Sequence, residues 1–207
     1  MKLRLSVTRE FSSQCEEKEK NEILEKQKHR CKACSISIKK YAKFEKTKEG
    51  YIGLCSVCHA SQHLETLPQK SAGKIIMLPE ISQVDLIALS RMIMLIKRLP
   101  SEEHSEDMDS AGLIHMLLNE AGQHAESFYA SGASDVELVA QMLSNQTDEA
   151  YEQREKGLYN MKWLPDYDYF KREMDYWFKV LMENEKSTYH PTKWENLHNM
   201  YLKNNKG

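Results

Sequence analysis

Cys31-Lys-Ala-Cys34 and Cys55-Ser-Val-Cys58-His59 are the two short stretches from which the rest of this chain is best understood. Each contains a Cys-x-x-Cys pair, and residues 35–54 lie between the two pairs. A Cys-x-x-Cys turn directs two thiolates at one point, so two such turns complete the tetrahedral shell of four ligands that Zn²⁺ prefers. The spacing therefore predicts one structural zinc ion bound by Cys31, Cys34, Cys55 and Cys58.

Two other uses of these cysteines explain less of the pattern. A redox dithiol requires only one Cys-x-x-Cys pair, and a haem attached through Cys55, Cys58 and His59 would leave the upstream pair without a role. The fifth cysteine, Cys15, has no partner once the other four bind zinc. We expect it to be a small, buried or half-buried thiol in a protein of the reducing cytosol.

Charge divides the chain into two predicted regions. The net charge of the 207 residues is −2, but Lys and Arg outnumber Asp and Glu over residues 1–80, and the reverse holds over residues 81–207. We predict a basic N-terminal region that contains the zinc module, followed by an acidic, aromatic-rich, α-helical region. The basic region can face nucleic acid or an acidic protein segment. Because the sequence shows no signal peptide and no run of ~18 apolar residues, we expect a cytoplasmic protein without direct membrane insertion.

The zinc module is predicted to be a β-hairpin followed by a helix. Apolar residues from Ile36 to Phe44 and from Tyr51 to Leu54 flank a turn, which is typical of two paired strands. Residues 59–66 then have the composition of a helix. With a helical region after it, this module predicts an α+β fold.

The remaining segments are predicted from periodicity and capping signals. We expect strands over residues 2–8 and 74–79, an acidic linker over 101–109, and helices over 16–29, 82–98, 110–129, from 134 onward, 166–185 and 193–204. The helix over 82–98 is apolar almost all round, which is typical of a central core helix. Aromatic residues concentrate between Tyr151 and Tyr201. They can form an aromatic core around Trp163, Phe170, Trp177 and Phe178, or a surface for a partner.

The hairpin, the Leu54-Cys55-Ser-Val-Cys58-His59 end and the helix after it resemble the HNH (ββα-metal) nuclease family over residues 20–66. The resemblance implies a structural zinc at the four cysteines and a second, catalytic metal. It also implies a histidine base on the first strand of the hairpin, but residues 35–54 contain neither histidine nor asparagine. A missing base costs roughly 10²- to 10⁴-fold in rate. We therefore predict a catalytically degenerate module and not an enzyme.

His59 and His63 are the residues that could stand at the position of the family's helix metal ligand. They are spaced i, i+4, which places them on one face of a helix. Two ligands alone are too few for a stable metal site. We favour the alternative in which His59 packs beside the zinc and hydrogen-bonds a thiolate or a backbone group.

Over its whole length the sequence resembles the DotN (IcmJ) family of the Dot/Icm type IVB secretion system. The resemblance rests on the opening Met1-Lys-Leu-Arg-Leu-Ser-Val-Thr-Arg-Glu, the four-cysteine module and the helical, aromatic-rich tail. It implies a non-catalytic zinc adaptor, in the cytoplasm and peripheral to an inner-membrane secretion complex, that supports the export of virulence effector proteins. The implied partners are the C-terminal segment of the DotL-like coupling ATPase and other subunits of the coupling complex.

Two alternative functions remain. One is an HNH-type, metal-dependent endonuclease, against which the missing hairpin histidine argues. The other is a zinc-dependent regulator that binds nucleic acid, against which the acidic, aromatic-rich second half argues.

Overall fold

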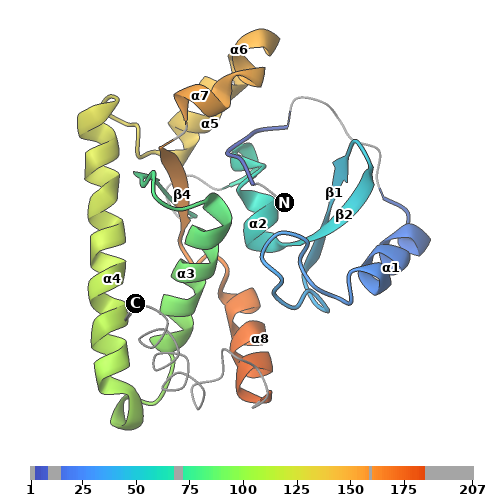
Figure 1. Ribbon diagram of the computed structural model, residues 1–207, viewed down its shortest axis with the longest axis vertical. Helices are drawn as coiled ribbons and strands as arrows, with labels where there is room; N and C mark the ends of the chain where they lie inside the picture. The colour runs from blue at the N-terminus through green and yellow to red at the C-terminus, as the bar shows by residue number, and fades with distance from the viewer. Residues whose placement is uncertain (1–2, 9–14, 68–71, 159, 185–207) are drawn as a thin grey trace, which may run out of the picture. The chain divides into compact units, whose positions relative to one another are not determined.

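The computed structural model describes residues 3–8, 15–67, 72–158 and 160–184 (Figure 1). These residues form helices and two small antiparallel sheets, so the predicted α+β class is confirmed.

Internal contacts divide the chain into two compact units, residues 1–171 and residues 172–207. The first unit contains both sheets and all the side-chain clusters described below. Nearly all of α8 (Lys171–Met182) belongs to the second unit. The sequence analysis divided the chain by charge into residues 1–80 and 81–207, and that division stays a prediction.

The hairpin of the zinc module lies between the two cysteine pairs. β1 (Ala42–Thr47) and β2 (Gly50–Cys55) pair antiparallel, with Thr47 opposite Gly50 at the turn. Gly50 has a φ of +116°, a conformation that glycine adopts at no steric cost. α2 (Ser56–Ala60) follows β2 directly, which gives the predicted order of strand, strand and helix.

α1 (Glu17–Lys26) contacts β2 of this hairpin. Its buried residue is Ile23. Just after the helix, the side-chain amide of Gln27 donates to the Gly53 carbonyl (2.9 Å) and accepts from the Gly53 N–H (2.8 Å). This pair of hydrogen bonds satisfies backbone groups on the free edge of β2 and holds the helix against it.

A second sheet and two long helices form the main hydrophobic core. β3 (Gly73–Met77) pairs antiparallel with β4 (Met161–Pro165), and α3 (Gln83–Ile96) and α4 (Ser101–Phe128) contact both each other and this sheet (Figure 1). The buried core residues are Ile76, Leu86, Ile93, Ala111, Leu118 and Leu164.

α3 is fixed to the sheet by Gln83. Its side-chain amide donates to the Trp163 carbonyl (2.8 Å) and accepts from the Trp163 N–H (2.8 Å). Trp163 is fully buried and packs edge to face with Phe170, whose ring centroid is 6.1 Å away. Trp163 and Phe170 therefore belong to a buried aromatic core, and not to a surface for a partner.

Shorter helices complete the described fold. They are the 3₁₀ helix η1 (Leu64–Thr66), α5 (Val136–Ser144), α6 (Asp148–Glu152) and α7 (Arg154–Gly157). α5 contacts η1, which links the core layer to the end of the zinc module.

The acidic segment over residues 101–109 was predicted to be a linker, and this prediction is wrong. The segment is the first part of α4. Glu is a good helix former, and Glu102 and Glu103 lie in the first turn, where negative charge interacts favourably with the helix dipole. The backbone departs from helical geometry at His104 (φ −133°, ψ 27°), which marks a kink near the start.

Two other predictions differ from the structure, and one strand was missed. Leu3, Leu5 and Val7 are buried as expected, but their segment forms no ladder, because Val7 N–H donates to the Tyr151 hydroxyl (3.0 Å). β4 was not predicted, and α8 begins at Lys171 and not at residue 166. The helix predicted over 193–204 lies outside the described residues.

Candidate metal centre

The first cysteine pair lies in a tight turn just before the hairpin. Cys31 N–H donates to the Ile36 carbonyl (2.8 Å), and Ser35 N–H donates to the Cys31 carbonyl (2.9 Å). Ser35 has a φ of +59°, so the chain reverses at this residue. Lys32 N–H donates to the Gly53 carbonyl (3.0 Å), which ties the turn to β2.

The second cysteine pair lies at the junction of β2 and α2. Cys55 is the last residue of β2 and also the N-cap of α2, where its Sγ accepts a hydrogen bond from Cys58 N–H (3.4 Å). An N-cap group satisfies a backbone donor that the helix leaves unpaired. The strand-to-helix transition therefore sets the positions of both sulfurs.

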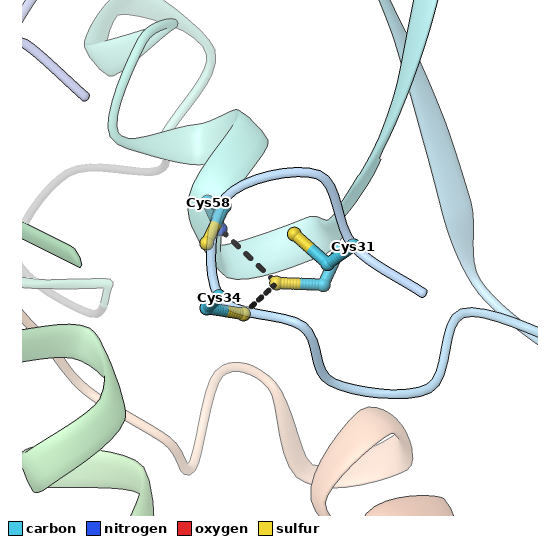
Figure 2. Close-up of side chains that lie close together, drawn as sticks. Cys31, Cys34 and Cys58 are labelled. Carbon is cyan, nitrogen blue, oxygen red and sulfur yellow. Dashed lines mark hydrogen bonds between the residues drawn. The ribbon is translucent and has the colours of Figure 1, made fainter. Parts of the chain in front are cut away.

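The four predicted ligands come together as one cluster. Their sulfur atoms all lie within 4.8 Å of one another, and Figure 2 shows Cys31, Cys34 and Cys58 directed toward a common point. The Cys34 and Cys55 sulfurs are 3.7 Å apart. Tetrahedral Zn–S bonds of ~2.3 Å require sulfurs about 3.8 Å apart. The donor set and its spacing can therefore hold one metal ion in a tetrahedral site.

Cys31, Cys55 and Cys58 are buried residues, and Cys34 is a partly exposed one. A buried arginine, Arg91 of α3, donates from Nη1 to Cys34 Sγ (3.3 Å). The pKa of Cys34 lies well below its ordinary value, because the three neighbouring thiols hydrogen-bond it and the Arg91 charge favours the thiolate. The thiolate, which is the form that binds a metal, is therefore favoured at Cys34. Burial and the neighbouring thiols raise the pKa of Cys55 and of Cys58, so these two are thiols until a metal displaces their protons.

A second cluster lies on the same module and includes a residue that the sequence analysis did not select. Glu45 of β1 directs Oε2 toward His63 Nε2 (2.5 Å) and His59 Nε2 (3.6 Å). The two imidazole rings stack with centroids 4.2 Å apart. One ligand atom from each residue lies within 4.8 Å of the others, so this cluster also could hold a metal ion.

The helix that was expected to carry both histidines is interrupted. His59 lies in α2, which ends at Ala60, and His63 precedes η1 as its N-cap. The rings nevertheless lie together because the chain turns between the two short helices. The described contacts of His59 are with Glu45 and His63 and not with a thiolate.

Hydrogen bonds around His63 define its charge. Its Nδ1 lies 2.7 Å from the Thr8 hydroxyl, which in turn donates to Glu65 Oε1 (2.6 Å). Burial alone lowers the pKa of His63, but the bonds to Glu45 and Glu65 outweigh it and raise the pKa to about 9. The pKa of His59 falls to about 4, through burial and the nearby His63 charge.

Cys15 lies outside both clusters. Its thiol is buried and lies 3.5 Å from Glu19 Oε2, and burial raises its pKa. It has the environment of a structural thiol, as predicted, and not of a nucleophile.

Glu45 and Arg91 are the two residues of these clusters that the sequence analysis missed. In a strand, alternate residues share a face, so Glu45 lies on the same face of β1 as Lys43 and Thr47. This alternation predicts which face Glu45 occupies, but it does not predict that its carboxylate contacts two imidazoles. Arg91 interrupts an otherwise apolar helix, which is the stronger signal, since a buried charge requires a partner.

No protein-family model matches the sequence, and no curated protein matches it. Over the described part of the chain, every helix is too short or too polar to span a bilayer.

Proposed function

We propose that the chain is a non-catalytic, zinc-binding adaptor subunit of a type IV secretion coupling complex. In this proposal Zn²⁺ occupies the Cys31, Cys34, Cys55 and Cys58 site and holds the hairpin, α2 and the first cysteine turn in one arrangement. The protein binds the C-terminal segment of the coupling ATPase and reaches the inner-membrane complex through it. The full-length resemblance to the DotN (IcmJ) family supports the partner, and the sulfur geometry supports the metal.

One observation carries the non-catalytic part of the proposal. The hairpin residue beside the two imidazoles is Glu45, whose carboxylate is already hydrogen-bonded to His63 at 2.5 Å. The next residue along β1 is Lys46, and no residue of the hairpin is a histidine. Hydrolysis of a phosphodiester requires a group free to accept a proton from water, and this hairpin supplies none of the usual kind.

Exposed apolar side chains support a protein partner. Several large apolar side chains are exposed on α4 and α5, and an exposed apolar surface often marks a site of protein binding. They are Leu113, Ile114, Met116, Leu117, Phe128, Leu138 and Met142. By contrast, Trp163, Tyr167 and Phe170 are buried and do not supply such a surface.

The test of this proposal is direct binding between purified components. We expect the full-length chain to co-elute with the C-terminal segment of the coupling ATPase in size-exclusion chromatography, with saturable binding by calorimetry. The control is the same segment with its sequence scrambled. Absence of binding at concentrations of tens of micromolar, together with salt-dependent DNA binding that has a steep log–log slope, would favour the nucleic-acid regulator instead.

The Glu45, His59 and His63 cluster favours a second candidate function, metal-dependent cleavage of a phosphodiester. Two imidazoles and one carboxylate form a ligand set that suits a divalent transition metal and leaves positions open. The adaptor proposal predicts no nicking of supercoiled plasmid in Mg²⁺, Mn²⁺ or Ni²⁺ above the level in chelator. Nicking that is lost in both Glu45→Gln and His63→Ala, but kept in Glu49→Gln at the turn of the hairpin, would establish the enzyme.

A further inference from the structure

A metal centre of four thiolates carries charge that the surrounding protein must balance. One Zn²⁺ and four thiolates sum to a net charge of −2, and three of the four cysteines are buried. A buried charge without a partner is strongly destabilising, so such a centre needs hydrogen-bond donors or a cation close by. Backbone N–H groups supply some of these hydrogen bonds, as Cys58 N–H does for Cys55 Sγ.

Arg91 is the cationic side chain that the fold brings to this centre. It lies on α3, outside the zinc module, and only 7% of it is exposed. Its Nη1 contacts the sulfur of Cys34, the one partly exposed residue of the four cysteines. A guanidinium stays charged under all physiological conditions and offers several N–H donors in a fixed plane, which suits a cluster of sulfurs.

The helix turn that carries Arg91 is itself held in place. Tyr167 is buried, and its hydroxyl donates to the Ile87 carbonyl (2.9 Å) and lies 3.3 Å from Ser90 Oγ. Leu86 and Ile93, on the same helix, belong to the main hydrophobic core. The position of the guanidinium is therefore set by the core layer and not by the zinc module.

We propose that Arg91 is a positioning residue for the metal, which compensates the charge of the thiolates and keeps Cys34 bound. This inference rests on the zinc site proposed above and goes beyond it, because it assigns part of the metal's retention to a helix outside the module. Cys34 is the one partly exposed residue of the four, so we expect a chelator to attack the centre there first. Without the Arg91 contact, Cys34 dissociates more readily and zinc leaves faster.

The test compares zinc release from the full-length protein and its variants. Outer-shell partners typically change metal affinity by roughly 10- to 100-fold, and we expect Arg91→Met to release zinc faster by a factor in this range when excess chelator is added. Arg91→Lys keeps the charge without the planar fork and gives an intermediate rate. Arg98→Met, just beyond the same helix, is the matched control and releases zinc at the wild-type rate.

A spectroscopic readout separates this role from a general loss of stability. In the Co²⁺-substituted protein, the thiolate-to-metal charge-transfer band reports electron density on sulfur, so Arg91→Met and Arg91→Lys shift the band and Arg98→Met does not. Release rates and spectra of both Arg91 variants that match the wild type would overturn the inference. A wild-type protein that carries no zinc and gives no four-thiolate cobalt spectrum would instead refute the zinc assignment.

Discussion

Cys55 has two roles that substitution can separate. Its sulfur belongs to the four-cysteine cluster and also caps α2 by accepting from Cys58 N–H. Serine is a favourable N-cap residue, so Cys55→Ser keeps an acceptor for that N–H. Its hydroxyl is a poor substitute for a thiolate as a zinc ligand. The stability lost in this variant therefore reports the metal and not the cap.

We predict that Cys55→Ser is purified without stoichiometric zinc and with a much lower melting temperature than the wild type. Binding of a structural metal contributes directly to the free energy of folding. Metal content by mass spectrometry and thermal melting measure the two effects. Cys15→Ser is the matched control, because Cys15 lies outside the cluster. Full zinc content in Cys55→Ser would contradict the four-cysteine site.

Gly73 is a second residue whose substitution has a definite consequence. Its φ is +126°, and a Cβ at this position would lie 2.2 Å from the Leu164 carbonyl oxygen. We predict that Gly73→Ala lowers the free energy of unfolding by roughly 2–5 kcal/mol, through backbone strain and steric overlap. Gly112→Ala, at an open position in α4, is the control and stabilises by about 0.5–1 kcal/mol. Equal urea midpoints for the two variants would show that β3 does not approach β4 as described.

At the scale of an element, α4 presents two different faces. Leu118 is 7% exposed and belongs to the main core, whereas its neighbour Leu117 is 54% exposed. We predict that Leu118→Ala lowers the free energy of unfolding by about 2–5 kcal/mol, because it leaves a cavity. Leu117→Ala changes it by less than about 0.5 kcal/mol. Chemical denaturation of both variants measures these free energies. A large loss of stability in Leu117→Ala would mean that the face of α4 that carries Leu117 is covered.

Local signals predicted some elements well and others poorly. The apolar run and the Ser82 cap located α3 to within two residues at each end, because the side chains that pack and the cap that starts the helix are all local. Residues 101–109 were misjudged because their polarity was taken as a sign of a loop, while their helix propensity and Pro100 before them indicated a helix start. β4 could not be found in this way, since its partner β3 is distant in sequence.

The candidate site shows the same division between local and long-range information. The four cysteines were predicted because two ligands lie within each short turn. Glu45 reaches the histidines only after β1 and α2 have packed, and Arg91 reaches Cys34 only after α3 has packed against the module. No spacing rule connects either residue to its partners. A charged residue within an apolar helix was the one available signal, and it indicated burial without naming the partner.

At the scale of the whole molecule, Arg91 and the contact between α5 and η1 tie the zinc module to the core layer within residues 1–171. We predict that zinc removal exposes more than the module. In hydrogen–deuterium exchange after chelation, amides of α3 over residues 83–96 exchange faster, as do those of β1 and β2. Readdition of zinc restores the slow rates. Faster exchange confined to residues 20–66 would mean that the two layers are energetically independent.

The pairing of β3 with β4 also determines the order in which the chain becomes native during synthesis. All four cysteines have left the ribosome soon after Cys58, whereas Ile75 and Ile76 must wait until residues 161–165 emerge. At translation rates of about 5–20 residues per second, that wait lasts seconds. During it the nascent chain presents an unpaired apolar strand edge, a template for wrong pairing. We therefore expect early zinc loading to coincide with a chain that still depends on chaperones.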